Sequence, residues 1–335
     1  MSADVAVLIV TYNSEQQISN CIRSVQVQRD HVRQQIIILD NDSTDATVAT
    51  IRREFPDVQL IIAGKNLGFA AGVNEAARHA DAAFLLLLNP DTEIVDHGVD
   101  VIVDFARQKP QYGLYGGRTL KADGSLESSS CWGRPTLWSM GLFAFGLTTL
   151  FPRNAFFDPE SLGSWQRDTI REVGVITGCF LLIGKDAWER LGGFDERYFM
   201  YGEDVDLAIR AHAAGYRPVI CPEAKLRHDV GQSSATPIAK MLLLFRGKAS
   251  LVRAHWKGLA QQLGLILLAT GVGMRALIGR IEVIIRPQPA GELWFTLWRA
   301  RGEWLRGYAP VPVAARRSGK EPGIITPLVK DLQNG

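Results

Sequence analysis

Apolar residues recur in short runs over the first 90 positions, and a polar cluster follows each run. The four runs cover residues 5–10, 35–39, 58–62 and 83–88. Continuous aliphatic runs of this length are typical of strands buried on both faces, and segments with helical spacing separate them. This alternation predicts an α/β fold in which a mainly parallel sheet is flanked by helices.

The polar clusters all fall at the carboxyl ends of these strands. They cover residues 11–14, 40–43, 65–69 and 89–91. In open parallel sheets ligands bind outside the carboxyl ends of the strands. We therefore expect the four clusters to converge on one crevice.

The remainder of the chain divides into less regular parts. Residues 128–170 show no clear periodicity and are interpreted as a mobile or acceptor-facing loop. A short helix over 185–191, a helix over about 203–214 and strands at 217–220 and 225–227 follow. We expect a catalytic domain over 1–235, a helical region over 236–310 and a flexible tail over 311–335.

Charge is distributed unevenly along the 335 residues, although the net charge is only +2. From Thr236 onward there are 15 basic and 5 acidic side chains, whereas the first 235 residues hold 22 basic and 30 acidic side chains. Such an asymmetry suggests that the second part meets an anionic surface. Its apolar character and its tryptophans favour lipid over nucleic acid, so we expect amphipathic helices lying in the membrane interface.

Two other interpretations of this C-terminal region are a transmembrane helix and a packed helical subdomain. The apolar run at 263–270 is shorter than the roughly 20 residues that span a bilayer, so a transmembrane helix is not expected. The helices could also form a subdomain packed on the core or in a homodimer.

The cysteine pattern and the N-terminal sequence indicate the cellular compartment in which the protein works. The four cysteines are far apart and lack metal-ligand spacing, as expected of free thiols in a reducing compartment. The first apolar run is short and preceded by Asp4, which indicates a strand rather than a signal peptide. We therefore expect cytoplasmic chemistry.

An acidic segment, FMYGEDVDLAIR at 199–210, is the first candidate for catalysis. Acids at a helix N-terminus are stabilised by the helix dipole, so a simple acidic cap is the alternative interpretation. Asp206 and Arg210 are i, i+4 neighbours that can pair, which leaves Glu203 and Asp204 to face the crevice.

A second candidate is a cation site formed by Asp91 and His228. Asp91 follows a buried strand and His228 follows the short strand at 225–227. A hard divalent ion, Mg²⁺ or Mn²⁺, with few protein ligands would suit a diphosphate, which supplies oxygen ligands of its own. A helix cap and a structural histidine are the alternative interpretations.

The motifs TYN, DNDSTD, NLGFAAGVN, NPD and TGCFLLIGKDAWERLGGFDERYFMYGEDVDL occur in this order. In this order, and with the later His228, they resemble the inverting family 2 glycosyltransferases of GT-A fold, in particular bacterial rhamnosyltransferase-like enzymes. The resemblance covers about residues 4–235. It implies transfer of a sugar from a nucleotide-sugar donor to a lipid-linked acceptor.

The resemblance also implies a role for individual residues. It assigns nucleotide-sugar binding to Thr11, Tyr12, Asn13, Asp40, Asn66, Gly68, Phe69 and Asn89. Tyr12 would lie against the base and Asp40 would accept a hydrogen bond from the pyrimidine. Asp91 stands for the last acid of the family's metal-binding DxD motif, whose first acid is replaced here by Asn89. Asp204 matches the catalytic base, and Glu203 supports it.

The expected activity follows from these roles. The donor of first choice is dTDP-rhamnose and the acceptor a polyprenyl-diphosphate-linked saccharide, used in cell-envelope polysaccharide synthesis at the cytoplasmic face of the inner membrane. UDP-sugar donors carrying galactose, N-acetylglucosamine or galactofuranose, and a non-catalytic nucleotide-sugar-binding module, are the alternatives. Nucleotidyltransferases and NAD-dependent enzymes would need a glycine-rich loop after the first strand, where this chain has TYNSEQQ.

Overall fold

The computed structural model describes residues 2–27, 31–228, 236–285 and 289–310. The chain forms two compact units. The first comprises Met1–Trp132, Trp165–Asp195 and Asp204–Ser233, and the second Gly133–Ser164, Glu196–Glu203 and Ser234–Gly335. The expected junction at residue 235 and the expected tail over 311–335 lie outside the described residues.

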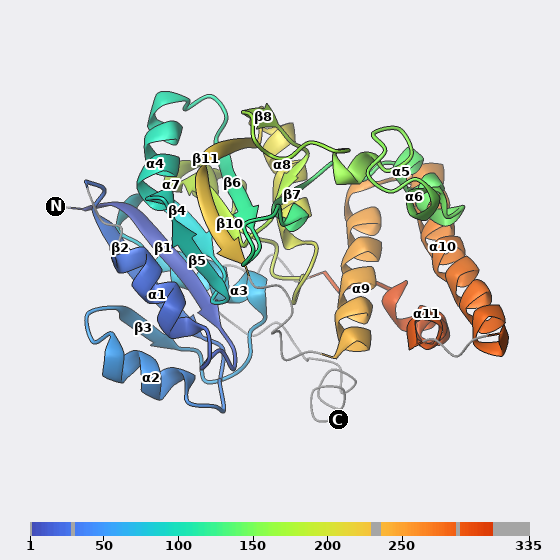
Figure 1. The fold of residues 1–335 in the computed structure, drawn as a ribbon, viewed down its shortest axis with the longest axis horizontal. Helices are drawn as coiled ribbons and strands as arrows, with labels where there is room; N and C mark the ends of the chain where they lie inside the picture. Colours follow the sequence, from blue (N-terminus) through green and yellow to red (C-terminus); the bar gives the residue numbers. More distant parts are fainter. Residues whose placement is uncertain (1, 28–30, 229–235, 286–288, 311–335) are drawn as a thin grey trace. The chain divides into compact units, whose positions relative to one another are not determined.

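The first unit is built on one nine-stranded sheet (Figure 1). Along the sheet the order is β3 (Gln59–Ile62), β2 (Gln34–Asp40), β1 (Ala3–Thr11), β4 (Ala82–Leu88), β10 (Phe180–Gly184), β6 (Leu114–Leu120), β11 (Val219–His228) and β5 (Thr92–Val95). The ninth strand, β8 (Arg171–Glu172), pairs with β11. The pairs among β1 to β4 are parallel, as predicted, whereas β10 is antiparallel to both of its neighbours. The strands expected at 217–220 and 225–227 are one strand, β11, with a register shift between Cys221 and Lys225.

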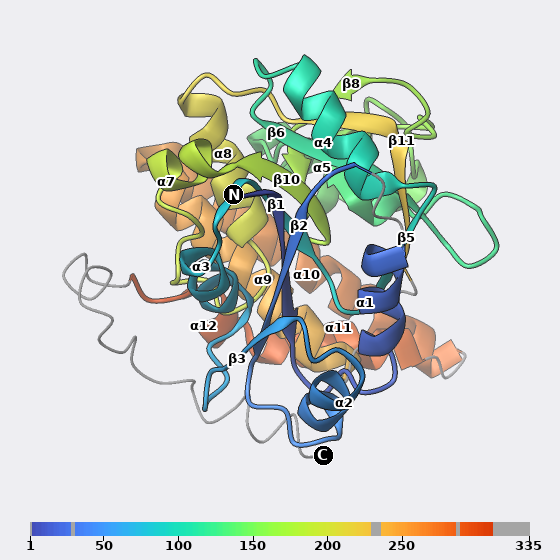
Figure 2. The same cartoon turned by 90° about the vertical axis from the view of Figure 1, so that its left-hand side faces the viewer.

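Helices cover both faces of this sheet. They are α1 (Ile18–Val27), α2 (Thr47–Glu54), α3 (Phe69–Arg78), α4 (Gly98–Gln108), α7 (Lys185–Leu191) and α8 (Glu203–Ala213). The apolar sides of α1 and α4 share one core with alternate residues of β1, whereas α3 packs on the opposite face, with Gly72 against Val10. Figure 2 shows α1 and α4 on one side of β1, and α3 and α7 on the other. The α/β fold with a helix-flanked sheet is confirmed, but the sheet is mixed rather than mainly parallel, because four of its strand pairs are parallel and four are antiparallel.

The segment 128–170 contains regular structure that its sequence did not predict. Besides the short strand β7 (Cys131–Trp132), which pairs with β9 (Val175–Ile176), it forms α5 (Leu137–Ala144) and α6 (Leu147–Leu150). Helix α5 is apolar on nearly every side, so no amphipathic period marks it. It begins with a capping box in which Thr136 and Ser139 exchange hydrogen bonds.

The second unit is mainly helical. Its C-terminal helices are α9 (Pro237–His255), α10 (Gly258–Ile285), α11 (Pro289–Arg299) and α12 (Arg301–Trp304). They pack around a cluster that includes Phe245, Leu268, Val272, Leu297 and Trp304. Helices expected over 236–310 are therefore present.

Helix α10 is longer than the apolar run at 263–270 indicated. Its 24 residues Gly258–Ile281 are long and apolar enough to cross a membrane by length and composition alone. A core helix of a soluble protein meets the same criteria, and 33 % of the most apolar stretch is buried within the protein. The helix therefore extends beyond the run at 263–270, because Arg275 does not end it, and the expectation that this segment does not cross a membrane stays a prediction.

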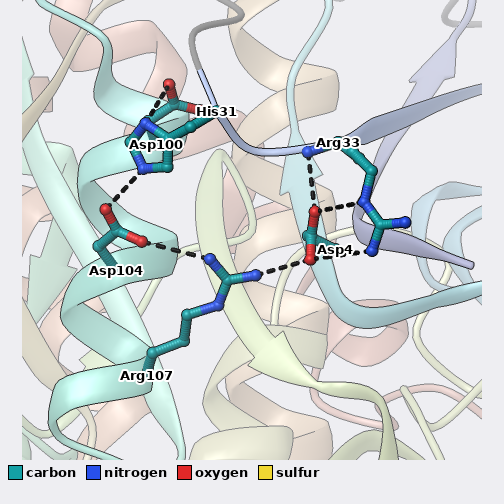
Figure 3. A network of polar contacts seen from close by, with 6 residues as sticks. All are labelled: Asp4, His31, Arg33, Asp100, Asp104 and Arg107. Carbon is teal, nitrogen blue, oxygen red and sulfur yellow. Dashed lines mark hydrogen bonds and ion pairs between the residues drawn. The ribbon is translucent and has the colours of Figure 1, made fainter.

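A polar network ties the amino-terminal ends of β1 and β2 to α4 (Figure 3). Asp4 accepts hydrogen bonds from Arg33 Nε at 3.0 Å and Arg107 Nη2 at 2.7 Å. These contacts continue through Asp104 to His31, whose Nε2 lies 2.8 Å from Asp104 Oδ2. The hydrogen bonds from Arg33 and the charges of both arginines lower the pKa of Asp4 to about 2.

Candidate active site

The first two polar clusters meet at the carboxyl ends of β1 and β2. Because these strands are parallel and in register, Thr11 lies beside Asp40. The Thr11 hydroxyl donates to Asp40 Oδ1 at 3.1 Å, and the Ser43 N–H donates to Asp40 Oδ2 at 2.9 Å. Thr11 and Asp40 are buried, at 0 % and 1 % exposure. A carboxylate accepts about four hydrogen bonds, so Asp40 keeps acceptor capacity for a ligand.

Asn13 joins the loops that follow β1 and β2. Its backbone N–H donates to Ser43 Oγ at 2.9 Å and its Oδ1 accepts from the Thr44 N–H at 2.8 Å. Its φ of 50° lies in the left-handed region, which asparagine tolerates better than most residues. The side chain that the resemblance assigns to the nucleotide thus holds the loop geometry, while the neighbouring Tyr12 is half-buried.

The third cluster is held by a residue that the sequence did not single out, Asn41. Its Oδ1 accepts from the Leu67 N–H at 3.1 Å and its Nδ2 donates to the Gly68 carbonyl at 3.0 Å. Asn66 Oδ1 accepts from the Gly68 N–H at 3.0 Å, and Gly68 has a φ of 81° before α3 begins at Phe69. The sequence feature that could have pointed to Asn41 is its position directly after Asp40.

The fourth cluster lies at the end of β4. The Asn89 N–H donates to the Cys179 carbonyl at 3.4 Å, and the Asn89 carbonyl accepts from the Thr92 hydroxyl at 2.7 Å. These contacts fix the turn that presents Asp91.

Asp91 and His228 are brought together from distant parts of the chain. Strand β5 pairs with the end of β11, so Thr92 lies opposite His228. Asp91 Oδ1 then lies 3.3 Å from His228 Nε2, with the two side chains 25 % and 12 % exposed. Neither Asp91 Oδ1 nor His228 Nδ1, both buried, has a hydrogen-bond partner within the described chain. A carboxylate oxygen without a hydrogen bond that faces an imidazole nitrogen fits a divalent cation.

These two residues form a minimal cation site. Over residues 2–27, 31–228, 236–285 and 289–310, no group of three or more His, Cys, Asp or Glu residues could hold a metal. A cation bound by Asp91 and His228 would therefore take most of its ligands from elsewhere.

Asp204 is the second residue of α8. Burial raises its pKa to about 6, against a hydrogen bond that its Oδ1 accepts from the Val205 N–H at 2.8 Å. Burial also raises the pKa of the Cys179 thiol to about 12, and the negative charges of Asp91 and Asp204 both add to that rise. The charges of both carboxylates therefore act on the Cys179 thiol, a relationship that the sequence did not reveal.

The predicted pairing of Asp206 with Arg210 is confirmed. Asp206 Oδ2 and Arg210 Nη2 form an ion pair at 2.7 Å, and Arg210 also donates to the Gly193 carbonyl at 2.9 Å. The pair thereby links α8 to the glycine turn that precedes it. Glu203 is 5 % exposed at the start of the helix.

Comparisons with known proteins point to the same family that the sequence motifs resemble. The sequence model of the family described as Glycosyl transferase family 2 matches residues 6–166. The N-acetylglucosaminyl-diphospho-decaprenol L-rhamnosyltransferase of Mycobacterium tuberculosis is 31 % identical over 75 % of this chain and 81 % of its own length. Rhamnosyltransferase WbbL of Escherichia coli is 26 % identical over 64 % of this chain and 78 % of its own.

A solved structure shares the fold. The mannosyltransferase PcManGT from Pyrobaculum calidifontis, in complex with GDP-Man and Mn2+, superposes with a TM-score of 0.52 at 18 % identity. The match covers 91 % of this chain and 84 % of that one.

Proposed function

The chain belongs to glycosyl transferase family 2, and from this premise we propose that it transfers L-rhamnose from dTDP-rhamnose to a hydroxyl of a polyprenyl-diphosphate-linked saccharide. The mycobacterial relative's name describes a rhamnosyl transfer to a lipid diphosphate sugar, which supports both the sugar and the acceptor class. The product would serve bacterial cell-envelope polysaccharide synthesis.

The observation that carries the proposal is the pair of carboxylates, Asp91 and Asp204, whose negative charges both act on the Cys179 thiol. Asp204 has a pKa of about 6, so it is mostly ionised at neutral pH yet still basic enough to accept a proton. The acceptor hydroxyl would lose its proton to Asp204 while its oxygen attacks the anomeric carbon. The bond from that carbon to the nucleoside diphosphate breaks in the same displacement, which inverts the anomeric centre.

Asp91 and His228 would hold Mg²⁺ or Mn²⁺ against the donor diphosphate. When bound, such an ion neutralises negative charge on the leaving diphosphate. The 3.3 Å approach of His228 Nε2 to an Asp91 Oδ1 that has no hydrogen bond within the described chain supports this assignment, as does the Mn2+ bound by the mannosyltransferase of Pyrobaculum calidifontis. Asp40 and the loop held by Asn41 would receive the nucleoside.

The donor is tested by comparing thermal shifts and transfer rates with dTDP-rhamnose, UDP-galactose, UDP-N-acetylglucosamine and GDP-mannose. The acceptor is a synthetic polyprenyl-diphosphate N-acetylglucosamine. We expect transfer, with inversion, from dTDP-rhamnose. Faster transfer from a UDP-sugar would replace the donor, and binding without turnover of any donor would instead indicate a nucleotide-sugar-binding module.

We further propose that the protein acts peripherally at the cytoplasmic face of the inner membrane, through helix α10. Large apolar side chains are exposed along this helix at Leu259, Leu263, Ile266, Met274, Leu277, Ile278 and Ile281. At about 3.6 residues per turn these positions all fall on one side of the helix, which we call the α10 apolar face. The surplus of basic residues after Thr236 favours an anionic lipid surface as its partner.

A further inference from the structure

The loop that leads the chain into Asp204 spans Glu196–Glu203 and belongs to the second unit, together with α9 and the residues after α12. We propose that Gly247 and Tyr308 are positioning residues that hold this loop, and through it Asp204, in the geometry that proton removal needs. The proposal rests on the proposed function, because it takes Asp204 as the base.

Tyr308 holds the loop from the C-terminal side. Its hydroxyl donates to the Met200 carbonyl at 3.0 Å, and its ring packs edge-on against Tyr198 with centroids 6.0 Å apart. Burial raises the pKa of Tyr308, and the negative charge of Glu203 adds to the rise. The hydroxyl therefore stays protonated and remains a donor.

Tyr308 is itself fixed to α9. Its backbone N–H donates to Ser250 Oγ at 2.7 Å, and the Arg246 guanidinium lies 4.7 Å from the centre of its ring. Arg246 Nε also donates to the Gly307 carbonyl at 3.3 Å. Helix α9 and the segment around Tyr308 thus form one support for the loop.

Gly247 lets α9 touch the loop backbone directly. A Cβ atom at this position would lie 2.1 Å from the Tyr201 carbonyl oxygen and 2.9 Å from its carbon. Neither atom belongs to a flexible side chain, so any residue larger than glycine must push the helix and the loop apart. This contact is two residues before Glu203, the first residue of α8.

The loop conformation needs such support. Tyr201 has a φ of 65°, which is rare for a bulky aromatic residue, and Gly202 follows with a φ of 108°. A strained residue of this kind persists only where its surroundings impose it. Without the contacts of Gly247 and Tyr308, the loop would relax and carry Asp204 with it.

A displacement of Asp204 would lower the reaction rate strongly. A general base must lie within hydrogen-bond reach of the proton that it removes. Misplacement by about 1 Å can lower a rate about 100-fold, even when its cause is remote from the chemistry.

The test compares Gly247→Ala and Tyr308→Phe with Gly302→Ala in the full-length protein. Gly302 is the matched control, because its added Cβ would meet no described atom within 4 Å. We expect kcat to fall about 10–100-fold in Gly247→Ala and about 3–10-fold in Tyr308→Phe. The affinity for the donor's nucleoside diphosphate should stay within about 2-fold of wild type, and Gly302→Ala should match wild type.

Hydrogen–deuterium exchange of residues 196–204 provides a readout that needs no substrate. Exchange should rise in both variants and not in the control. Tyr308→Phe removes a single oxygen, so it keeps the test valid if Gly247→Ala fails to fold.

The outcomes separate this proposal from the proposed function. Unchanged exchange in Tyr308→Phe overturns the proposal whatever the activity. Raised exchange with wild-type kcat also overturns it, because the contacts would then only stabilise the fold. Absence of sugar transfer by the wild-type protein would instead contradict the proposed function, and the positioning role for Asp204 would fall with it.

Discussion

His228 Nε2 lies 3.3 Å from Asp91 Oδ1, although the two residues are 137 positions apart in the sequence. The pairing of β5 with β11 creates this contact. Asp91 and His228 supply only two ligands, so a cation held by them would depend on further ligands from the diphosphate. The cation and the donor should therefore bind cooperatively.

The first prediction concerns this site. Asp91→Asn keeps the shape of the side chain but removes its negative charge, and it should raise the Mn²⁺ concentration needed for half-maximal transfer at least about 10-fold. Asp96→Asn is the control, because that side chain is 67 % exposed and pairs with Lys225. An unchanged Mn²⁺ requirement in Asp91→Asn would exclude Asp91 as a ligand.

The second prediction concerns the pH dependence of catalysis. With a pKa of about 6, Asp204 is protonated and unable to accept a proton at lower pH. Below pH 6, kcat should therefore fall about tenfold per pH unit, and it should level off above pH 7. Asp204→Asn should lower kcat about 10²–10⁴-fold at pH 7.5 while nucleotide binding, measured by calorimetry, persists. Normal turnover in this variant would remove Asp204 from the role of base.

The third prediction concerns stability. The folded-state pKa of Asp204 is raised above its unfolded value, so ionisation of Asp204 destabilises the fold as pH rises from about 4 to about 6. Asp204→Asn should then raise the free energy of unfolding at pH 7 by on the order of 2 kcal/mol, and hardly at all at pH 4. Urea unfolding measures this. Asp186→Asn, an exposed acid in the first turn of α7, should give no such gain.

The fourth prediction concerns the network around Asp4. Its pKa of about 2 lies below the unfolded value, so its contribution is present above pH 4 and is lost as pH falls toward 2. Asp4→Asn should lower the free energy of unfolding at pH 7 by on the order of 1 kcal/mol, because the arginines are half exposed and water screens them. The loss should shrink between pH 4 and pH 2. Equal losses in Asp57→Asn, an exposed acid, would contradict the network's role.

The fifth prediction concerns the α10 apolar face. Ile266→Glu combined with Leu277→Glu should reduce sedimentation with phosphatidylglycerol vesicles at least about 10-fold, because burial of each apolar side chain contributes roughly 1.5–3 kcal/mol. Gln262→Glu adds a charge to an exposed position of the same helix and should change binding little. Vesicle binding that survives the double substitution would exclude this face, and loss of dimers would identify it as a contact between copies.

The sequence predicted the parts of this protein that local patterns determine. The buried strands read as unbroken apolar runs, and their polar ends converge because parallel strands end at the same edge. The ion pair of Asp206 with Arg210 needed only one helical turn of spacing.

Other features depend on contacts between distant segments. Asn41 holds the loop at Gly68 through two hydrogen bonds, and nothing in its local pattern distinguishes it from a turn residue. The insertion of β10 between β4 and β6 follows from pairing across the chain. Helix α5 escaped prediction because a helix that is apolar on all sides has no period to detect.

The contacts of the loop over 196–203 have a consequence for how the protein is made. During synthesis the sheet of the first unit can form while α9 to α12 are still inside the ribosome, since domains fold as their residues emerge. The loop acquires its contact with Tyr308 only after residue 308 has emerged. A nascent chain should therefore bind nucleotide before it is able to transfer a sugar. An incompletely synthesised chain that lacks residue 308 would then not act on the acceptor.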